Sequence, residues 1–237
     1  MKKIAIYGDS FGAEHAPYGW SYLLQQEDPD NIDIYAQPSS SLDWSFNNFL
    51  TQHSNYEQNI FVVTTQGRVH LPVRCQHKKT KEIKIIEHWG GLDQIEEAML
   101  EYTSDYDMLQ KLWDCAVYVA SKQYIYLFNT HKAIVNYIKH IRPDTIIIPA
   151  FRTGDPSIDA DINGDYNWSL IDICTRETAK FGELGKIKND TRCNHFSKPS
   201  NQWVLSHVKA RLEGKMIEWT GTETPAFQNY EELRLYS

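Results

Sequence analysis

The sequence has no cysteine pair at the spacing that metal sites use. Its four cysteines lie far apart, and none belongs to a CxxC motif. This disfavours a zinc ribbon, and scattered cysteines define no disulfide framework. The cysteines are Cys75, Cys115, Cys174 and Cys193.

The sequence also lacks an excess of positive charge. With 24 Lys and Arg against 31 Asp and Glu, the net charge is −7, which argues against a nucleic-acid partner because such a partner needs a basic face. The one basic cluster, at 77–81, is interpreted as a solvated loop. Hydrophobic residues make up 41% of the chain and charged residues 23%, values typical of a globular protein. A single domain over residues 1–237 is expected.

No long hydrophobic run is present. The apolar stretch that starts the chain ends at Tyr7 and meets Gly8-Asp9. It is too short for a signal peptide core or a membrane span. A cytoplasmic protein without a membrane partner is therefore expected.

Short apolar runs alternate with helical patterns along the chain. Such alternation predicts an α/β fold with a mainly parallel sheet, and continuously apolar strands suit a sheet covered on both faces. Strands are predicted over 3–7, 31–36, 59–65 and 144–150, and helices over 18–26, 41–52, 108–141, 170–181 and 197–212.

Two segments interrupt this alternation. Residues 68–105 and 151–186 are predicted to be irregular insertions, and residues 213–237 to be a C-terminal tail. The first insertion holds one apolar run, 83–86. This first insertion is interpreted as a lid-like excursion.

Ser10 is the main candidate for chemistry. It follows the first predicted strand, and ligands of open parallel sheets bind beyond the carboxyl ends of the strands. A nucleophilic serine needs a neighbouring base, usually a histidine that a carboxylate orients. His195 and Asp190 lie together before the last predicted helix, so we expect Ser10 as nucleophile, His195 as base and Asp190 as orienting acid. The alternative is a strand-to-helix turn in which Ser10 only caps a helix.

The stretch Gly8-Asp9-Ser10-Phe11, with an Asp…His loop before the last helix, resembles the SGNH (GDSL-like) hydrolase family. The resemblance implies a flavodoxin-like three-layer α/β/α sandwich and hydrolysis of esters, often acyl groups on lipids, carbohydrates or small molecules. It implies no cofactor. It also implies an oxyanion hole built by the N–H of the serine, a glycine N–H after the second strand and an Asn side chain after the third.

The middle of the sequence departs from that family pattern. Ser39 stands near the expected glycine, and Gln66 or Arg68 would have to replace the expected asparagine. The family places its acid three residues before the histidine, where this chain has Arg192, so Asp190 would reach from two residues further away. The loss of one oxyanion donor costs about 100- to 1,000-fold in rate.

The function predicted from these residues is a serine esterase that hydrolyses an acetyl or short acyl ester, with a carbohydrate ester as one substrate class. Two alternatives remain open. The absent glycine and asparagine motifs are compatible with a binding protein that retains the fold without chemistry. The same acyl-enzyme could also pass its acyl group to an alcohol, which would make the protein an acyltransferase.

A calcium site is a weaker alternative for Asp159, Asp161 and Asn163. These residues match the first half of an EF-hand loop, in which alternate oxygens face one cation. The acid expected at the twelfth position is Leu170, so an acidic surface loop is favoured. His70, His77 and His88 fit no HExxH-like pattern, and no metal is expected at the catalytic site.

Overall fold

A computed structural model describes residues 2–13, 19–38, 40–64, 69–76, 83–90, 114, 124–151, 169–170 and 198–215. The chain has an α/β fold whose main sheet is four-stranded and all parallel, in the order β2-β1-β3-β6. Its strands are β1 (Ile4–Gly8), β2 (Ile32–Ala36), β3 (Gln58–Val63) and β6 (Ile146–Pro149). The predicted α/β class and parallel pairing are confirmed for this part of the chain.

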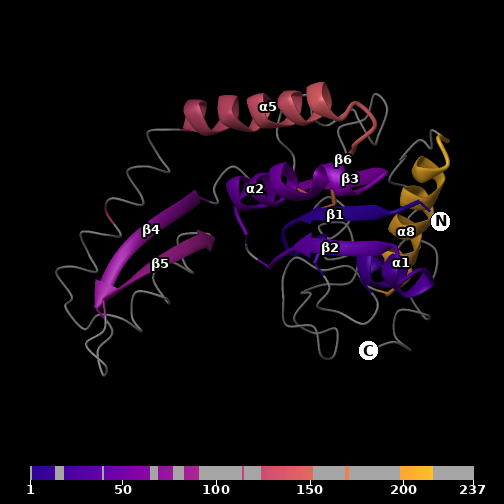
Figure 1. Cartoon of the computed structure of the whole chain (residues 1–237), viewed down its shortest axis with the longest axis horizontal. Coiled ribbons are helices and arrows are strands. Elements are labelled where there is room, and N and C mark those ends of the chain that lie inside the picture. The colour runs from indigo at the N-terminus through magenta and orange to yellow at the C-terminus, as the bar shows by residue number, and fades with distance from the viewer. Residues whose placement is uncertain are drawn as a thin grey trace, which may run out of the picture.

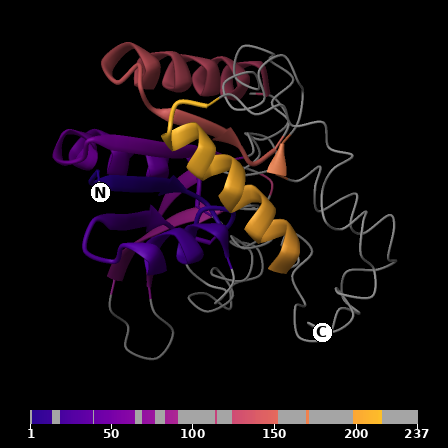
Figure 2. The same ribbon diagram turned by 90° about the vertical axis from the view of Figure 1, so that its right-hand side faces the viewer.

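In the described part of the chain, helices cover both faces of this sheet (Figures 1 and 2). They are α1 (Trp20–Glu27), α2 (Leu42–Gln52), α5 (Tyr124–Ile141) and α8 (Lys198–Leu212). A 3-10 turn, η1 (His53–Asn55), follows α2. Helices α1 and α8 pack on one face of the sheet and α2 and α5 on the other.

The core consists of two apolar layers because each central strand is buried on both faces. All residues of β1, β3 and β6 are buried, whereas β2, at the edge of the sheet, is mostly half-buried. One layer joins Ile6, Val62, Trp20 and Val204. The other layer joins residues that alternate with those along the strands and includes Phe61. The continuous apolar runs thus mark strands that helices cover from both sides.

The interval predicted as an irregular insertion contains regular structure. Strands β4 (Val69–Gln76) and β5 (Ile83–Gly90) form an antiparallel pair, which Figure 1 shows apart from the main sheet. Both strands are edge strands of a two-stranded ribbon. Proline has no backbone N–H to donate to a neighbouring strand, so it is tolerated in an edge strand such as β4, which contains Pro72. The prediction missed this ribbon because polar residues and a proline interrupt its apolar pattern.

Other predicted elements are described only in part. The predicted helix over 108–141 is described as α5 and at residue 114. The predicted helix over 170–181 is described at Leu170 alone. The second insertion beyond Phe151, except residues 169–170, and the tail beyond Lys215 lie outside the described residues. Among the described helices, none is long and apolar enough to span a membrane.

Arg142 ties the end of α5 to the segment that enters β3. Its guanidinium donates to the backbone oxygens of His53, Tyr56 and Glu57 at 2.8, 3.1 and 3.0 Å. It also pairs with Asp144, at 3.1 Å from Nε to Oδ1. The hydrogen bond from Arg142 lowers the pKa of the Asp144 carboxyl. These contacts fasten the amino edge of the sheet, opposite the edge at which Ser10 lies.

Candidate functional site

The residues after β1 form a tight turn at the carboxyl edge of the sheet. The N–H of Gly12 donates to the backbone oxygen of Asp9 at 2.9 Å, which closes a four-residue β-turn with Ser10 in its second position. Gly8 leads into this turn with φ +155°, and Gly12 lies against Val62 and Ala36. The turn therefore sits between the ends of the neighbouring strands, β2 and β3.

A buried carboxylate holds this turn in place. Asp9 is fully buried. Its Oδ1 accepts the N–H of Phe11 at 3.0 Å, and its Oδ2 accepts the hydroxyl of Thr64 at 2.7 Å. Thr64 directly follows β3, so the carboxylate joins the ends of two adjacent strands.

Ser10 differs from its neighbours in this turn in its hydrogen bonding. Its side chain is half-buried, and neither its N–H nor its Oγ makes a hydrogen bond within the described part of the chain. The neighbours of Ser10 are thus held by hydrogen bonds, while the N–H and the hydroxyl of Ser10 itself make none within the described residues. A rigid turn that presents an unengaged hydroxyl and N–H is suited to attack on a carbonyl carbon and to stabilisation of the resulting oxyanion.

The connection from β2 to α2 reaches the same point. The backbone oxygen of Gly8 accepts the N–H of Gln37 at 3.1 Å and the hydroxyl of Ser40 at 3.0 Å. Ser41 then caps α2, because its side chain accepts the N–H of Trp44 at 3.3 Å. The neighbours of Ser39 in the chain are therefore bound to the end of β1.

The fourth strand also ends beside the turn. The N–H of Ala150 donates to the backbone oxygen of Val63 at 2.9 Å. The ring of Phe151 meets that of Phe11 edge to face, with centroids 5.6 Å apart. The second predicted insertion thus leaves the sheet next to the Ser10 turn.

Of the residues predicted for the site, the structure describes Ser10. The remaining predicted site residues lie outside the described residues, as do the three residues of the alternative calcium loop: His195, Asp190, Ser39, Gln66, Arg68, Asp159, Asp161 and Asn163. The structure brings the described neighbours of Ser39 and Gln66 to the Ser10 turn, through Ser40 and Thr64. Among the described residues, no group of three or more His, Cys, Asp or Glu could hold a metal ion.

Two titratable side chains elsewhere in the fold are not suited to act as the base. His53 lies at the amino end of β3, and burial followed by the charge of Arg142 lowers its pKa. Tyr7 points into the core on β1, where burial raises its pKa far above the physiological range. His53 therefore lies at the amino edge of the sheet, opposite Ser10, and the hydroxyl of Tyr7 stays protonated.

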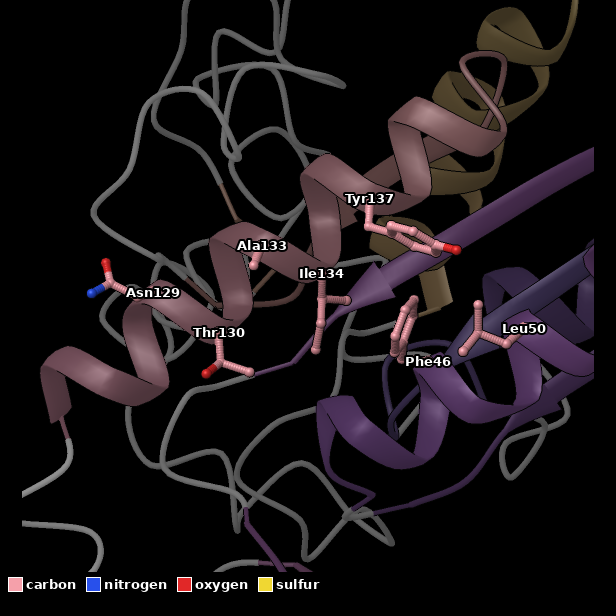
Figure 3. Close-up of a pocket in the computed structure, with 7 residues that line it drawn as sticks. All are labelled: Phe46, Leu50, Asn129, Thr130, Ala133, Ile134 and Tyr137. Atoms are coloured by element: carbon pink, nitrogen blue, oxygen red, sulfur yellow. The ribbon is translucent and has the colours of Figure 1, made fainter.

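A separate apolar groove of about 540 Å³ lies between α2 and α5. Figure 3 shows Phe46 and Leu50 of α2 facing Ile134 and Tyr137 of α5. Leu50 of α2 is 41% exposed here. Ser10 does not line this groove, and the described residues that do line it include no histidine, carboxylate or lysine that could act as the base.

Sequence reasoning missed Asp9, Thr64, Ser40, Trp20 and Asn201 as residues that organise the site. Asp9 had one signal, its place beside Ser10 directly after an apolar strand. The other four contribute through contacts between distant segments, for which a single sequence carries no periodic pattern.

Comparison of the chain with protein-family models, with curated proteins and with solved structures finds no match in any of the three.

One prediction concerns the bond between Thr64 and Asp9. Replacing Thr64 by valine conserves shape but leaves a buried carboxylate oxygen without that donor, and we expect a loss of about 1–3 kcal/mol in the free energy of unfolding. Urea denaturation measures it. The matched control is Thr51→Val, because Thr51 donates only to exposed backbone oxygens of its own helix and should change stability by less than about 0.5 kcal/mol. Equal losses in the two variants would contradict this role of Asp9.

Proposed function

We propose that the protein is a serine esterase of the SGNH type, with a flavodoxin-like three-layer sandwich and Ser10 as its nucleophile. The substrate class is a carboxylic ester with an acetyl or short acyl group, a carbohydrate ester among them. The observation that carries the proposal is the Ser10 turn: it is held by a buried carboxylate at the carboxyl edge of a parallel sheet, and Ser10 keeps its hydroxyl and N–H unengaged.

The proposed reaction has two halves. In the first, Oγ of Ser10 attacks the carbonyl carbon while His195 takes the hydroxyl proton. The tetrahedral intermediate then collapses, and His195 returns the proton to the leaving alcohol. In the second half, water adds to the acyl-serine with His195 again as base, which releases the acid and restores Ser10. Asp190 orients the imidazole, and no cofactor takes part.

The oxyanion requires donors near Ser10. The N–H of Ser10 is the first, since it is unengaged within the described residues. The N–H of Ser39 is the second, supported by the bond from Ser40 to Gly8. Gln66 or Arg68 supplies the third, supported by the anchoring of Thr64 beside Asp9. A weaker third donor than the family asparagine would slow catalysis without changing its course.

The test is the turnover of p-nitrophenyl acetate by the protein and by its Ser10→Ala variant, with and without an added sugar alcohol. Turnover that depends on Ser10 in water alone supports the esterase. Turnover that rises only with the sugar alcohol identifies an acyltransferase that uses the same nucleophile. Equal rates for the two proteins would contradict both activities and leave a binding role for the fold.

A further inference from the structure

Trp20 connects the Ser10 turn to helix α8. Its indole Nε1 donates to the backbone oxygen of Phe11 at 2.6 Å, and its backbone N–H donates to Oδ1 of Asn201 at 3.0 Å. Trp20 is 1% exposed and Asn201 is 5% exposed. Through Trp20, two buried hydrogen bonds thus link Phe11 to Asn201 of α8, although these two residues lie 190 positions apart in the chain.

The bond from Trp20 to Asn201 replaces a missing helix cap. Helix α1 begins at Trp20, and its N-cap residue, Gly19, makes no side-chain cap hydrogen bond. The first N–H groups of a helix need acceptors, which an N-cap side chain usually provides. Here one acceptor comes from the first turn of another helix, α8. The contact therefore sets where the first turn of α8 lies relative to α1.

The first turn of α8 consequently lies at the carboxyl edge of the sheet. Helix α1 starts at this edge because it follows the Ser10 turn, and Asn201, which is buried, is hydrogen-bonded to its first residue. His195 precedes the first residue of α8, Lys198, by three positions. Three residues of chain span at most about 11 Å. The anchoring of α8 therefore places the described end of the segment that carries His195 at this edge.

We propose that Asn201 and Trp20 are positioning residues for the reaction at Ser10. They hold the start of α8 against the Ser10 turn. The segment that carries His195 is thereby positioned for proton transfer with Ser10. This inference rests on the proposed esterase function and adds to it a structural cause for the meeting of the two ends of the chain. Asn201 acts through His195 and does not touch the substrate.

The test compares kcat and KM for p-nitrophenyl acetate in two variants of Asn201. Asn201→Leu removes the acceptor and should lower kcat at least about 10-fold with little change in KM, because small displacements of a catalytic group reduce rate steeply. Asn201→Asp retains an acceptor oxygen beside a helix N-terminus, which favours negative charge, and should keep most of the wild-type kcat. If Asn201→Leu does not fold, Asn201→Ala takes its place.

The matched control lies at the other end of α1. The side-chain amide of Gln25 donates to the backbone oxygen of Ile32 at 3.0 Å, at the first residue of β2 and so at the amino edge of the sheet. Gln25→Leu should keep the wild-type kcat even if it lowers the unfolding midpoint as much as Asn201→Leu does. Equal losses of kcat in these two variants would make Asn201 a merely structural residue and overturn the proposal.

A double variant separates this inference from the proposed function. If Asn201 acts through His195, Asn201→Leu should have no further effect on kcat in a His195→Ala background. A full 10-fold loss in that background would overturn the positioning role while leaving the esterase intact. If Ser10→Ala has the turnover of the wild type, the esterase function itself fails, and the positioning role fails with it.

Discussion

Replacing Ser10 by alanine is expected to lower kcat for p-nitrophenyl acetate by about 10⁴-fold or more, because a serine nucleophile and its base act as one unit. The fold should be unaffected. Ser10 is half-buried and makes no hydrogen bond among the described residues, so its hydroxyl contributes nothing to stability there. Steady-state kinetics measure the rate, and urea denaturation checks the fold.

The matched control for this change is Ser206→Ala. Ser206 is exposed on α8, and its hydroxyl donates to the backbone oxygen of Trp203 at 2.7 Å. The same atom is removed from a helix outside the Ser10 turn, so kcat should stay within about twofold of wild type. A Ser10→Ala protein that is folded and as active as Ser206→Ala would contradict the assignment of Ser10.

The second large effect is expected from Gly8→Ala. A Cβ at this position would lie 2.5 Å from Cβ of Val62, and φ is +155°, a value that L-residues rarely adopt. Overpacking and backbone strain each cost about 1–3 kcal/mol, so we expect a loss of about 2–6 kcal/mol in the free energy of unfolding. Any folded fraction should also lose activity, since Ser10 follows two residues later. Urea denaturation and kinetics measure the two effects.

Gly214 provides the control for the backbone contribution. It follows α8 with φ +77°, in a turn closed by the bonds Lys215 N–H to Ala210 O and Gly214 N–H to Arg211 O. A Cβ there would meet nothing within 4 Å, so Gly214→Ala carries only the cost of the left-handed conformation, about 1–2 kcal/mol. If Gly8→Ala costs no more than Gly214→Ala, the close approach of β1 to Val62 does not constrain the turn.

The sheet could be predicted from the sequence because burial on both faces leaves a continuous apolar run. The runs that became β1, β3 and β6 are of this kind, and the alternating β2 lies at the edge. The ribbon of β4 and β5 escaped prediction because its strands pair with each other alone, and such strands tolerate polar residues and Pro72.

The place of Ser10 could be predicted for a related reason. A strand that ends in Gly8-Asp9 must turn at the carboxyl edge of a parallel sheet, where ligands bind. The contacts of Asp9 with Thr64 and of Trp20 with Asn201 join residues 55 and 181 positions apart. Hydrogen bonds that single polar side chains make to distant residues leave no periodic trace in a sequence, so only the folded chain reveals them.

The most direct measurement of the central claim is covalent labelling with an alkyl fluorophosphonate. The Oγ of an activated serine forms a bond to phosphorus and displaces fluoride, which leaves a stable adduct. We predict one phosphonyl group per chain, placed on Ser10 by peptide mass spectrometry, with slower labelling of His195→Ala. An unlabelled protein, or an adduct that persists in Ser10→Ala, would contradict the account.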